Sequence, residues 1–162
     1  MTEAESDRVI ELFVLAFYRD PTWSWAFPDD DKRMDQHRSL WGLFLHSALP
    51  YGCVWMTDDG GAASLWIPPG EPELSDQDNA RVEPLVRELV GPRADAVLML
   101  LERFDANHPR DVTHYYLSLL GTHPDHRGQG KGMGLLAANL AAIDELGLPT
   151  YLESSNRAND HR

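Results

Sequence analysis

The chain has 162 residues, of which 43% are hydrophobic, with five tryptophans and one cysteine. This length and composition predict a single domain over residues 1–162, and they exclude wholesale disorder and an internal disulfide. The formal net charge of −12 argues against nucleic-acid binding, which needs a basic face. It is compatible with an amine-bearing substrate, although solubility alone also accounts for it.

Membrane association is not expected either. No apolar run approaches the roughly 18 residues that span a bilayer, and no basic, apolar leader opens the sequence, so we expect a cytoplasmic protein. The single cysteine, Cys53, lies among apolar neighbours, which favours a buried and inert thiol over a nucleophile. No metal site is predicted.

Two helices are predicted at the start of the chain. The first begins at the capping box Thr2–Glu5 and ends at Asp20-Pro21, and the second runs from about Asp30 to just before Pro50. The segment W-S-W-A-F, residues 23–27, follows the proline and is interpreted as a loop.

A hairpin and two more helices follow. The β-rich runs at 52–56 and 62–68 flank the turn D-D-G-G, which is a good hairpin signal. The proline-containing stretch 68–78 is predicted to be a surface loop. Helical patterns then cover about 79–90 and 94–106.

The last third of the chain is predicted to form a strand, a loop, a helix and a second strand. A largely buried strand over 112–123 precedes the run H-R-G-Q-G-K-G-M-G at 126–134. An amphipathic helix then extends to about 146, and a short parallel strand covers 150–153. The pattern as a whole predicts an α+β fold with a mixed α/β sheet and one β-α-β crossover.

The glycine-rich run at the start of a helix is a potential anion site, because the N–H groups of a first helical turn are free. A nucleoside-triphosphate loop is excluded, since Asp125 stands where its first glycine belongs and Gly132 replaces its hydroxyl residue. A dinucleotide fingerprint lacks its third glycine, although Glu153 lies where such a fold carries its ribose-binding acid. The pattern Q/R-x-x-G-x-G/A matches residues 127–132 at every position.

Two motifs resemble those of the GNAT-type N-acetyltransferases. The run Y-L-S-L-L-G-T-H-P-D-H-R-G-Q-G-K-G, residues 116–132, is similar to the acetyl-CoA-binding motif of that family, and L-E-S-S-N-R-A-N, residues 152–159, is similar to the motif that follows it. The segments A-F-Y-R-D-P-T-W-S-W-A-F-P-D and W-I-P-P-G resemble a branch that includes puromycin N-acetyltransferase.

The resemblance implies a GNAT-like acyl-CoA N-acyltransferase fold, in which a mostly antiparallel sheet contains a splayed pair of parallel strands. It also implies transfer of an acetyl group from acetyl-CoA to the primary amine of a small molecule by direct attack. The alternative is a non-catalytic module that binds acyl-CoA.

The resemblance further implies a coenzyme A site along the glycine-rich run. Its backbone N–H groups would hold the pyrophosphate, with positive charge from Arg127 and Lys131, and the run comprises Gly128, Gln129, Gly130, Lys131, Gly132 and Met133. The strand before the run would splay through a bulge and pair with the pantetheine arm at Leu120, Gly121 and Thr122. Asn156 would reach the cofactor from the following loop. Gly134 has no binding role and is expected to ease helix packing.

The catalytic groups are less clearly indicated. Direct transfer needs a deprotonated amine, a stabilised oxyanion and a protonated thiolate, and the resemblance gives the oxyanion to the N–H near Leu120. Many family members carry a glutamate before the bulge, where this chain has Ser118. The candidate catalytic residues are therefore Glu153, Tyr116 and Ser118. Glu153 or Tyr116 would act as the base through an ordered water, with Glu153 as a ligand of the substrate amine as the alternative, and each of the three also fits a purely structural role. His114 and His123 rank lower.

The resemblance also has implications for the acceptor site and for the C-terminal part of the fold. Trp23, Trp25 and Phe27 occupy the segment that forms the substrate wall in the family, with core packing as the alternative. The family pattern continues past its second asparagine with a tyrosine general acid, a helix and two strands, whereas this sequence ends three residues after Asn159. The resemblance thus predicts a fold truncated after its fifth strand, or strands supplied by a second protomer in a homodimer.

Overall fold

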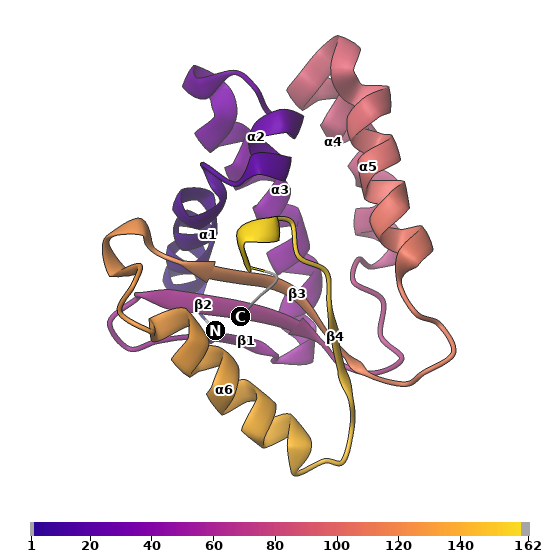
Figure 1. Ribbon diagram of the computed structural model, residues 1–162. Coiled ribbons are helices and arrows are strands. Elements are labelled where there is room, and N and C mark those ends of the chain that lie inside the picture. Colours follow the sequence, from indigo (N-terminus) through magenta and orange to yellow (C-terminus); the bar gives the residue numbers. More distant parts are fainter. Residues whose placement is uncertain (1, 160–162) are drawn as a thin grey trace.

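The computed structural model describes residues 2–159 and contains a four-stranded sheet in the order β1-β2-β3-β4 (Figure 1). Strands β1 and β2 pair antiparallel, as do β2 and β3, whereas β3 and β4 are parallel. This arrangement confirms the predicted α+β fold with a mixed sheet. The strands are β1 (Val54–Met56), β2 (Ala62–Ile67), β3 (Tyr115–Thr122) and β4 (Thr150–Leu152).

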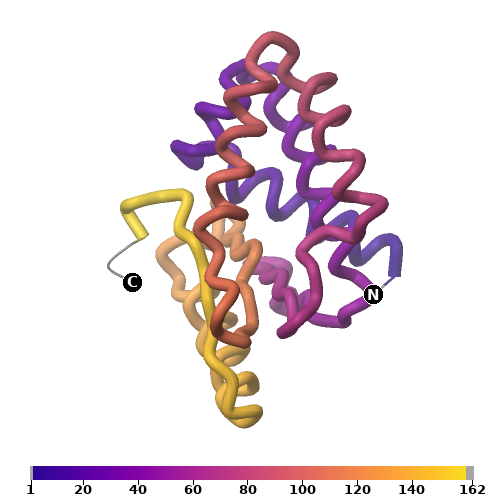
Figure 2. Tube along the Cα trace, turned by 90° about the vertical axis from the view of Figure 1, so that its right-hand side faces the viewer, coloured from indigo at the N-terminus to yellow at the C-terminus, as the bar shows by residue number. Residues whose placement is uncertain are grey.

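Helices cover both faces of the sheet. Helices α1 and α3 contact one face, α6 contacts the other, and α4 and α5 pack together beside α3. In the turned view α6 and the α4–α5 pair lie at opposite ends of the molecule (Figure 2). The helices are α1 (Glu3–Phe17), α2 (Pro21–Ala26), α3 (Asp30–Ala48), α4 (Asp76–Val90), α5 (Ala94–Asn107) and α6 (Lys131–Asp144). None of the helices within residues 2–159 is long and apolar enough to cross a membrane.

The first helix begins at the predicted capping box, in which Thr2 and Glu5 satisfy each other's backbone N–H groups. The loop predicted for residues 23–27 is wrong, because Pro21 starts the short helix α2. The Asp20 side chain accepts hydrogen bonds from the backbone N–H groups of Thr22 and Trp23 at 3.0 and 3.2 Å. An acidic N-cap followed by proline at the first helical position is a start signal as well as a stop signal.

The predicted hairpin is confirmed. The loop after β2 and the last two strands are shorter than predicted. The loop after β2 ends at Ser75, whose side chain caps α4 by accepting from the Asp78 backbone N–H at 3.1 Å. The strand predicted over 112–123 covers Tyr115–Thr122, and the final strand ends at Leu152.

The sheet separates two apolar clusters. All six residues of β2 are buried, with Leu65 in the cluster formed with α1 and α3, and Trp66 packed with Ile143 of α6. On the α6 side, the buried Asn139 side-chain oxygen accepts hydrogen bonds from Ser64 Oγ at 2.8 Å and Trp66 Nε1 at 3.1 Å. This acceptor satisfies two polar groups that burial would otherwise leave unpaired.

Strand β3 carries a β-bulge at Ser118. Leu65 pairs with Leu119 and the next residue, Trp66, pairs with Leu117, so Ser118 is the extra residue. In a regular strand, side chains two positions apart point to the same face, so Leu117 and Leu119 would share one face of the sheet. Because the bulge adds a residue between them, Leu119 packs in the cluster with α1 and α3, and Leu117 packs in the cluster with α6.

The parallel pairing of β3 with β4 ends just before the bulge. It joins Tyr115–Leu117 to Thr150–Leu152, and within residues 2–159 no strand pairs with that side of β3 from Ser118 to Thr122. The sheet therefore parts at the bulge, which is the splayed parallel pair expected of the fold.

Candidate active site

A cleft of about 1950 Å³ lies along the part of β3 that has separated from β4. Its walls come from β3, the loop 68–75, α5, the glycine-rich loop before α6, and the segment after β4. A typical small-ligand pocket measures about 300–1,000 Å³, so this cleft has room for a long cofactor and a second substrate.

The glycine-rich loop ends in an open helix N-terminus. Gly130 is the N-cap of α6 with φ of 76°, a left-handed conformation that favours glycine, and no side chain of the described residues caps this end. Gly132 lies against β3, because a Cβ there would approach Thr122 Oγ1 to 2.3 Å. Within residues 2–159 no side chain occupies the backbone N–H groups of this first turn, whose residues line the cleft.

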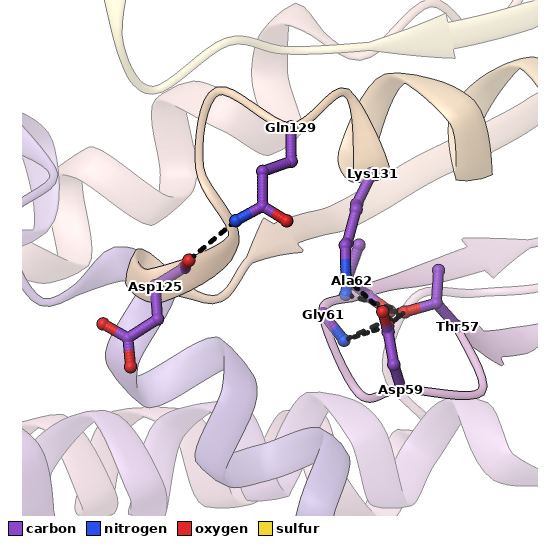
Figure 3. Close-up of polar contacts among 7 residues, drawn as sticks. All are labelled: Thr57, Asp59, Gly61, Ala62, Asp125, Gln129 and Lys131. Atoms are coloured by element: carbon purple, nitrogen blue, oxygen red, sulfur yellow. Dashed lines mark hydrogen bonds and ion pairs between the residues drawn. The ribbon is translucent and has the colours of Figure 1, made fainter.

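By contrast, the polar side chains of the loop hold it in place. The Arg127 guanidinium donates to the Ala16 carbonyl at 2.7 Å, and Gln129 donates to the Asp125 carbonyl at 3.0 Å. The Lys131 ammonium group binds Asp59 in the turn between β1 and β2 (Figure 3). The charges expected to assist an anion are therefore engaged in anchoring the loop at separate points.

The turn that receives Lys131 is itself ordered by hydrogen bonds. Asp59 Oδ1 accepts from the Thr57 hydroxyl at 2.8 Å and from the Gly61 backbone N–H at 2.9 Å (Figure 3). The bond from Lys131 is the largest cause that holds the pKa of Asp59 well below its usual range. A Cβ on Gly61 would lie 2.6 Å from the Lys131 stem, so the lysine crosses directly over this glycine.

The other proposed cofactor residues lie along the same cleft. Gly121 faces α1, where a Cβ would meet Phe13 at 2.9 Å and Leu12 at 3.0 Å. Asn156 accepts a hydrogen bond from the Ala158 backbone N–H at 3.0 Å. Of the predicted cofactor residues, Gln129 is the one outside the lining, which includes Leu120, Gly121, Thr122, Arg127, Gly128, Gly130, Lys131, Gly132, Met133 and Asn156.

Gly134 is not a packing glycine, so that prediction is wrong. A Cβ at this position would meet nothing within 4 Å, and its φ is not in the left-handed region.

Two tyrosines bind Glu153 at the other end of the cleft. The Tyr116 hydroxyl donates to Glu153 Oε2 at 2.9 Å and the Tyr151 hydroxyl donates to Oε1 at 3.0 Å. Burial, and then the neighbouring carboxylates, raise the pKa of Tyr116. The predicted residues Tyr116 and Glu153 are thus in direct contact.

The bulge residue Ser118 binds a carboxylate that sequence analysis missed. Its hydroxyl donates to Glu73 Oε1 at 2.5 Å, across 45 positions of sequence. Glu73 is half-buried in the cleft wall, and burial raises its pKa to about 7. The negative charges of Glu153 and Asp105 act in the same direction, and the hydrogen bond from Ser118 opposes them.

The position of Glu73 follows from the register of the sheet, which the sequence alone does not specify. Because β2 runs antiparallel to β3, its last residue Ile67 lies opposite Tyr116. The loop that follows Ile67 must therefore start beside the first half of β3.

His114 lies at the cleft in a pair with His108. Its Nδ1 lies 2.6 Å from the Val112 carbonyl, which only accepts, so this nitrogen carries the proton. The Nε2 atoms of the two rings are 3.0 Å apart, within hydrogen-bond distance. Burial lowers the pKa of His108. His123, in contrast, accepts a backbone hydrogen bond from Asp125 at 3.2 Å within its own turn.

The three predicted substrate-wall aromatics occupy different environments. Trp23 lines the cleft and packs edge-on against Trp41, with ring centroids 4.7 Å apart. Phe27 is buried in the core beside His37, and Trp25 is 48% exposed under the Arg93 guanidinium. The structure brings only Trp23 of this set into the lining of the cleft.

Cys53 stands apart from the cleft. The thiol is half-buried and lies 3.3 Å from the Tyr51 carbonyl. Burial raises its pKa, which disfavours the reactive thiolate.

The segment after β4 is tied to the N-terminal helices. The Thr22 hydroxyl donates to the Ser155 carbonyl at 2.6 Å, and the Ser155 hydroxyl donates to Asp20 Oδ2 at 2.8 Å. These bonds hold one wall of the cleft against the start of α2.

Charge is distributed unevenly along the cleft. The part near the segment between α1 and α2 and the start of α6 is lined by the basic side chains of Arg19, Arg127 and Lys131, and by Asp20 next to Arg19 in the sequence. The part formed by the loop 68–75, α5, the start of β3 and the segment after β4 is lined by Glu71, Glu73, Glu102, Asp105, Asp111 and Glu153, with Arg110 paired to Asp105. No group of three or more potential metal-ligating side chains within residues 2–159 is arranged to hold a metal ion.

The parted sheet, the bulge and the open helix end define the GNAT-type acetyltransferase fold. The chain is similar to a crystal structure from Corynebacterium glutamicum described as histone acetyltransferase HPA2 and related acetyltransferase. The TM-score is 0.67 at 22% sequence identity, and the match covers 99% of this chain and 77% of the other. No model of a known protein family matches the sequence.

Proposed function

We propose that the chain is an acetyl-CoA-dependent N-acetyltransferase that acetylates the primary amine of a small molecule by direct attack. One observation carries the proposal. The strand that parts from its neighbour at Ser118 leads through the glycine-rich loop into a helix N-terminus that no described side chain caps, and both line one cleft.

The fit of coenzyme A rests on the backbone. A pyrophosphate suits the first turn of α6, because free N–H groups and the helix dipole favour negative charge there. The glycines at 130 and 132 keep this turn clear of side chains, and a Cβ at either position is strained or crowded. Since Arg127 and Lys131 are already engaged, the main chain supplies most of the contacts.

The unpaired side of β3 suits the remainder of the cofactor. The strand from Leu119 to Thr122 has backbone donors and acceptors facing the gap left by β4, which an extended amide-containing arm could pair with as an added strand does. When bound, acetyl-CoA supplies the activated thioester. An N–H of this strand near Leu120 would stabilise the developing oxyanion.

The amine would occupy the acidic part of the cleft. The carboxylates around Glu73 and Glu153 attract an ammonium ion, and Trp23 and Tyr116 supply aromatic surface for its apolar portion. The chain's net charge of −12 adds long-range attraction for a cation.

The test is binding of coenzyme A and acetyl-CoA, measured by titration calorimetry on the wild type, Gly130→Val and Gly132→Val. We expect micromolar affinity for the wild type and loss of detectable binding in both variants. Gly134→Ala is the matched control, because it adds a methyl group to the same helix in open space. Unchanged affinity in the Gly130 and Gly132 variants would contradict the assignment of the cofactor site.

Turnover separates the enzyme from the alternative of a non-catalytic binding module. Thiol release from acetyl-CoA is followed with benzylamine, tryptamine and 1,4-diaminobutane as acceptors. Acetylation of any of these amines supports the transferase. Binding of acetyl-CoA without turnover across a wider amine panel supports the module.

A further inference from the structure

The point where the sheet parts carries a carboxylate with an unusual environment. Glu73 comes from the loop 68–75, not from β3, and its Oε1 is fixed by the hydroxyl of the bulge residue Ser118 at 2.5 Å. Within residues 2–159 no other side chain or backbone group donates a hydrogen bond to Glu73, so Oε2 is left for a ligand in the cleft.

We propose that Glu73 is the general base that takes a proton from the acceptor ammonium ion, and that Ser118 is the positioning residue that holds it at the bulge. This inference rests on the proposed acetyl transfer. The inference goes beyond acetyl transfer because it assigns the base to a loop residue that none of the sequence motifs contains.

Glu153 is the competing carboxylate, and its contacts favour a different role. Both of its oxygens accept hydrogen bonds from phenols, Tyr116 on one side and Tyr151 on the other. A base must come within hydrogen-bond reach of the proton that it removes. Among residues 2–159, Glu73 has one carboxylate oxygen that accepts from no protein donor, whereas each oxygen of Glu153 already accepts a hydrogen bond. We therefore assign Glu153 to the attraction of the ammonium ion.

The proton balance of the reaction is complete without a further reagent. Glu73 carboxylate removes one proton from the ammonium ion, which frees the nitrogen lone pair. The nitrogen then bonds to the thioester carbonyl carbon, and the carbon–sulfur bond breaks with its electron pair on sulfur. The second nitrogen proton passes to the thiolate, and Glu73 returns its own proton to solvent. The products are the amide and the free thiol.

The surroundings of Glu73 set the pH at which it can act. It is faced by Tyr116 and Ser118 of β3, by Glu153 after β4 and by Asp105 of α5, and Arg110 pairs with Asp105. Burial and the two carboxylates place its pKa at about 7, so the base form is largely present at pH 8 and is lost as pH falls through 7. A base with this pKa is well matched to a neutral operating pH.

The experiment is the pH dependence of kcat/KM from pH 5.5 to 9, using whichever of benzylamine, tryptamine or 1,4-diaminobutane the wild type acetylates best. Glu73→Gln should lower kcat/KM at pH 8 by about 10²- to 10⁴-fold and remove the decline on the acid side. Ser118→Ala should keep that decline and move its midpoint to higher pH, because the hydrogen bond that it removes lowers the pKa of Glu73. Glu88→Gln, on the exposed face of α4, is the control.

Three other results would contradict the assignment of Glu73 as the base, each for a different reason. A Glu73→Gln variant that raises KM with unchanged kcat would show a ligand and not a base. Loss of the acid-side decline in Glu153→Gln but not in Glu73→Gln would transfer the role to Glu153. If the wild type acetylates no amine, the proposed function fails and the base assignment falls with it.

A second measurement does not depend on turnover. In wild-type protein with ¹³C-labelled glutamate carboxyl groups, NMR should show one resonance that titrates near pH 7. That resonance should be absent in Glu73→Gln and shifted upward in its midpoint in Ser118→Ala. Absence of such a resonance in folded wild-type protein would overturn the assignment even if the enzyme is active.

Discussion

Asp59, in the turn between β1 and β2, binds the ammonium group of Lys131 at the start of α6 (Figure 3). Lysines in glycine-rich loops are commonly interpreted as phosphate ligands, and the sequence alone favours that role here. In the folded chain the same charge is balanced by a carboxylate and fixes the loop to the hairpin. The two possible roles of Lys131 make opposite predictions for the removal of Asp59.

Asp59→Asn should weaken binding of coenzyme A by a few-fold if the ion pair positions the loop, because the helix N-terminus is then less firmly held. Lys131→Met, which keeps the stem over Gly61, should weaken it by a similar factor, and the double variant should add little to either. Titration calorimetry at several salt concentrations measures these effects. Tighter binding in Asp59→Asn would instead show that the carboxylate competes with a phosphate for Lys131.

His37 is expected to make the protein less stable in acid. It is fully buried between Phe27 and Trp41, and burial lowers its pKa to about 4. In the unfolded chain the imidazole of His37 gains a proton below about pH 6.5, whereas in the folded chain it gains one only below about pH 4. The free energy of unfolding therefore falls as pH drops between these values, by up to about 3 kcal/mol.

Urea unfolding at pH 7 and pH 4.5 checks this prediction. His37→Leu should lose most of this pH dependence, although the substitution changes packing at both pH values. The exposed His46 on the same helix gives the control, because its replacement leaves the buried imidazole in place. A wild-type stability that is equal at both pH values would contradict the prediction.

Asn139→Ala should destabilise the protein by about 2–4 kcal/mol, because it leaves the buried Ser64 hydroxyl and Trp66 indole N–H without their acceptor. The change is measured by urea unfolding. Asn107→Ala, at an exposed helix end, removes an amide in a solvated position and should change stability by less than about 1 kcal/mol. Equal effects of the two substitutions would argue against the buried acceptor role.

Ser155→Ala should loosen the cleft wall that follows β4. It removes the hydrogen bond to Asp20 but leaves the caps that Asp20 provides to α2. Amide hydrogen exchange should become faster over residues 153–159 and stay unchanged in α2. Faster exchange in α2 as well would show that Ser155 supports the helix and not only the wall.

Features that depend on neighbours in sequence were largely predictable. The cap at Thr2, the D-D-G-G hairpin and the glycine-rich entry to α6 are local signals, and they fix most helices and strands to within a few residues. The cap at Ser75 is a local signal too, although the predicted loop extended to Asp78. The missed helix α2 also had a local signal, since Asp20 and Pro21 serve as N-cap and first helical residue.

Features that depend on long-range contacts were not predictable in this way. The pairing of Ser118 with Glu73, and of Lys131 with Asp59, joins residues 45 and 72 positions apart. Two tryptophans of one segment differ in their surroundings, since Trp23 lines the cleft and Trp25 is exposed. Such outcomes require the register of β2 against β3 and the packing of α2 on α3, which no short motif specifies.

The hydrogen bond between Thr22 and Ser155 has a consequence for how the protein is made. It joins the second helix to the segment after β4 across 133 positions of sequence, and that segment forms a wall of the cleft. A ribosome must therefore deliver nearly all of the described chain before the wall can close, even though the first three helices are complete much earlier. A nascent chain stopped before Ser155 would carry the glycine-rich loop but not a closed cleft.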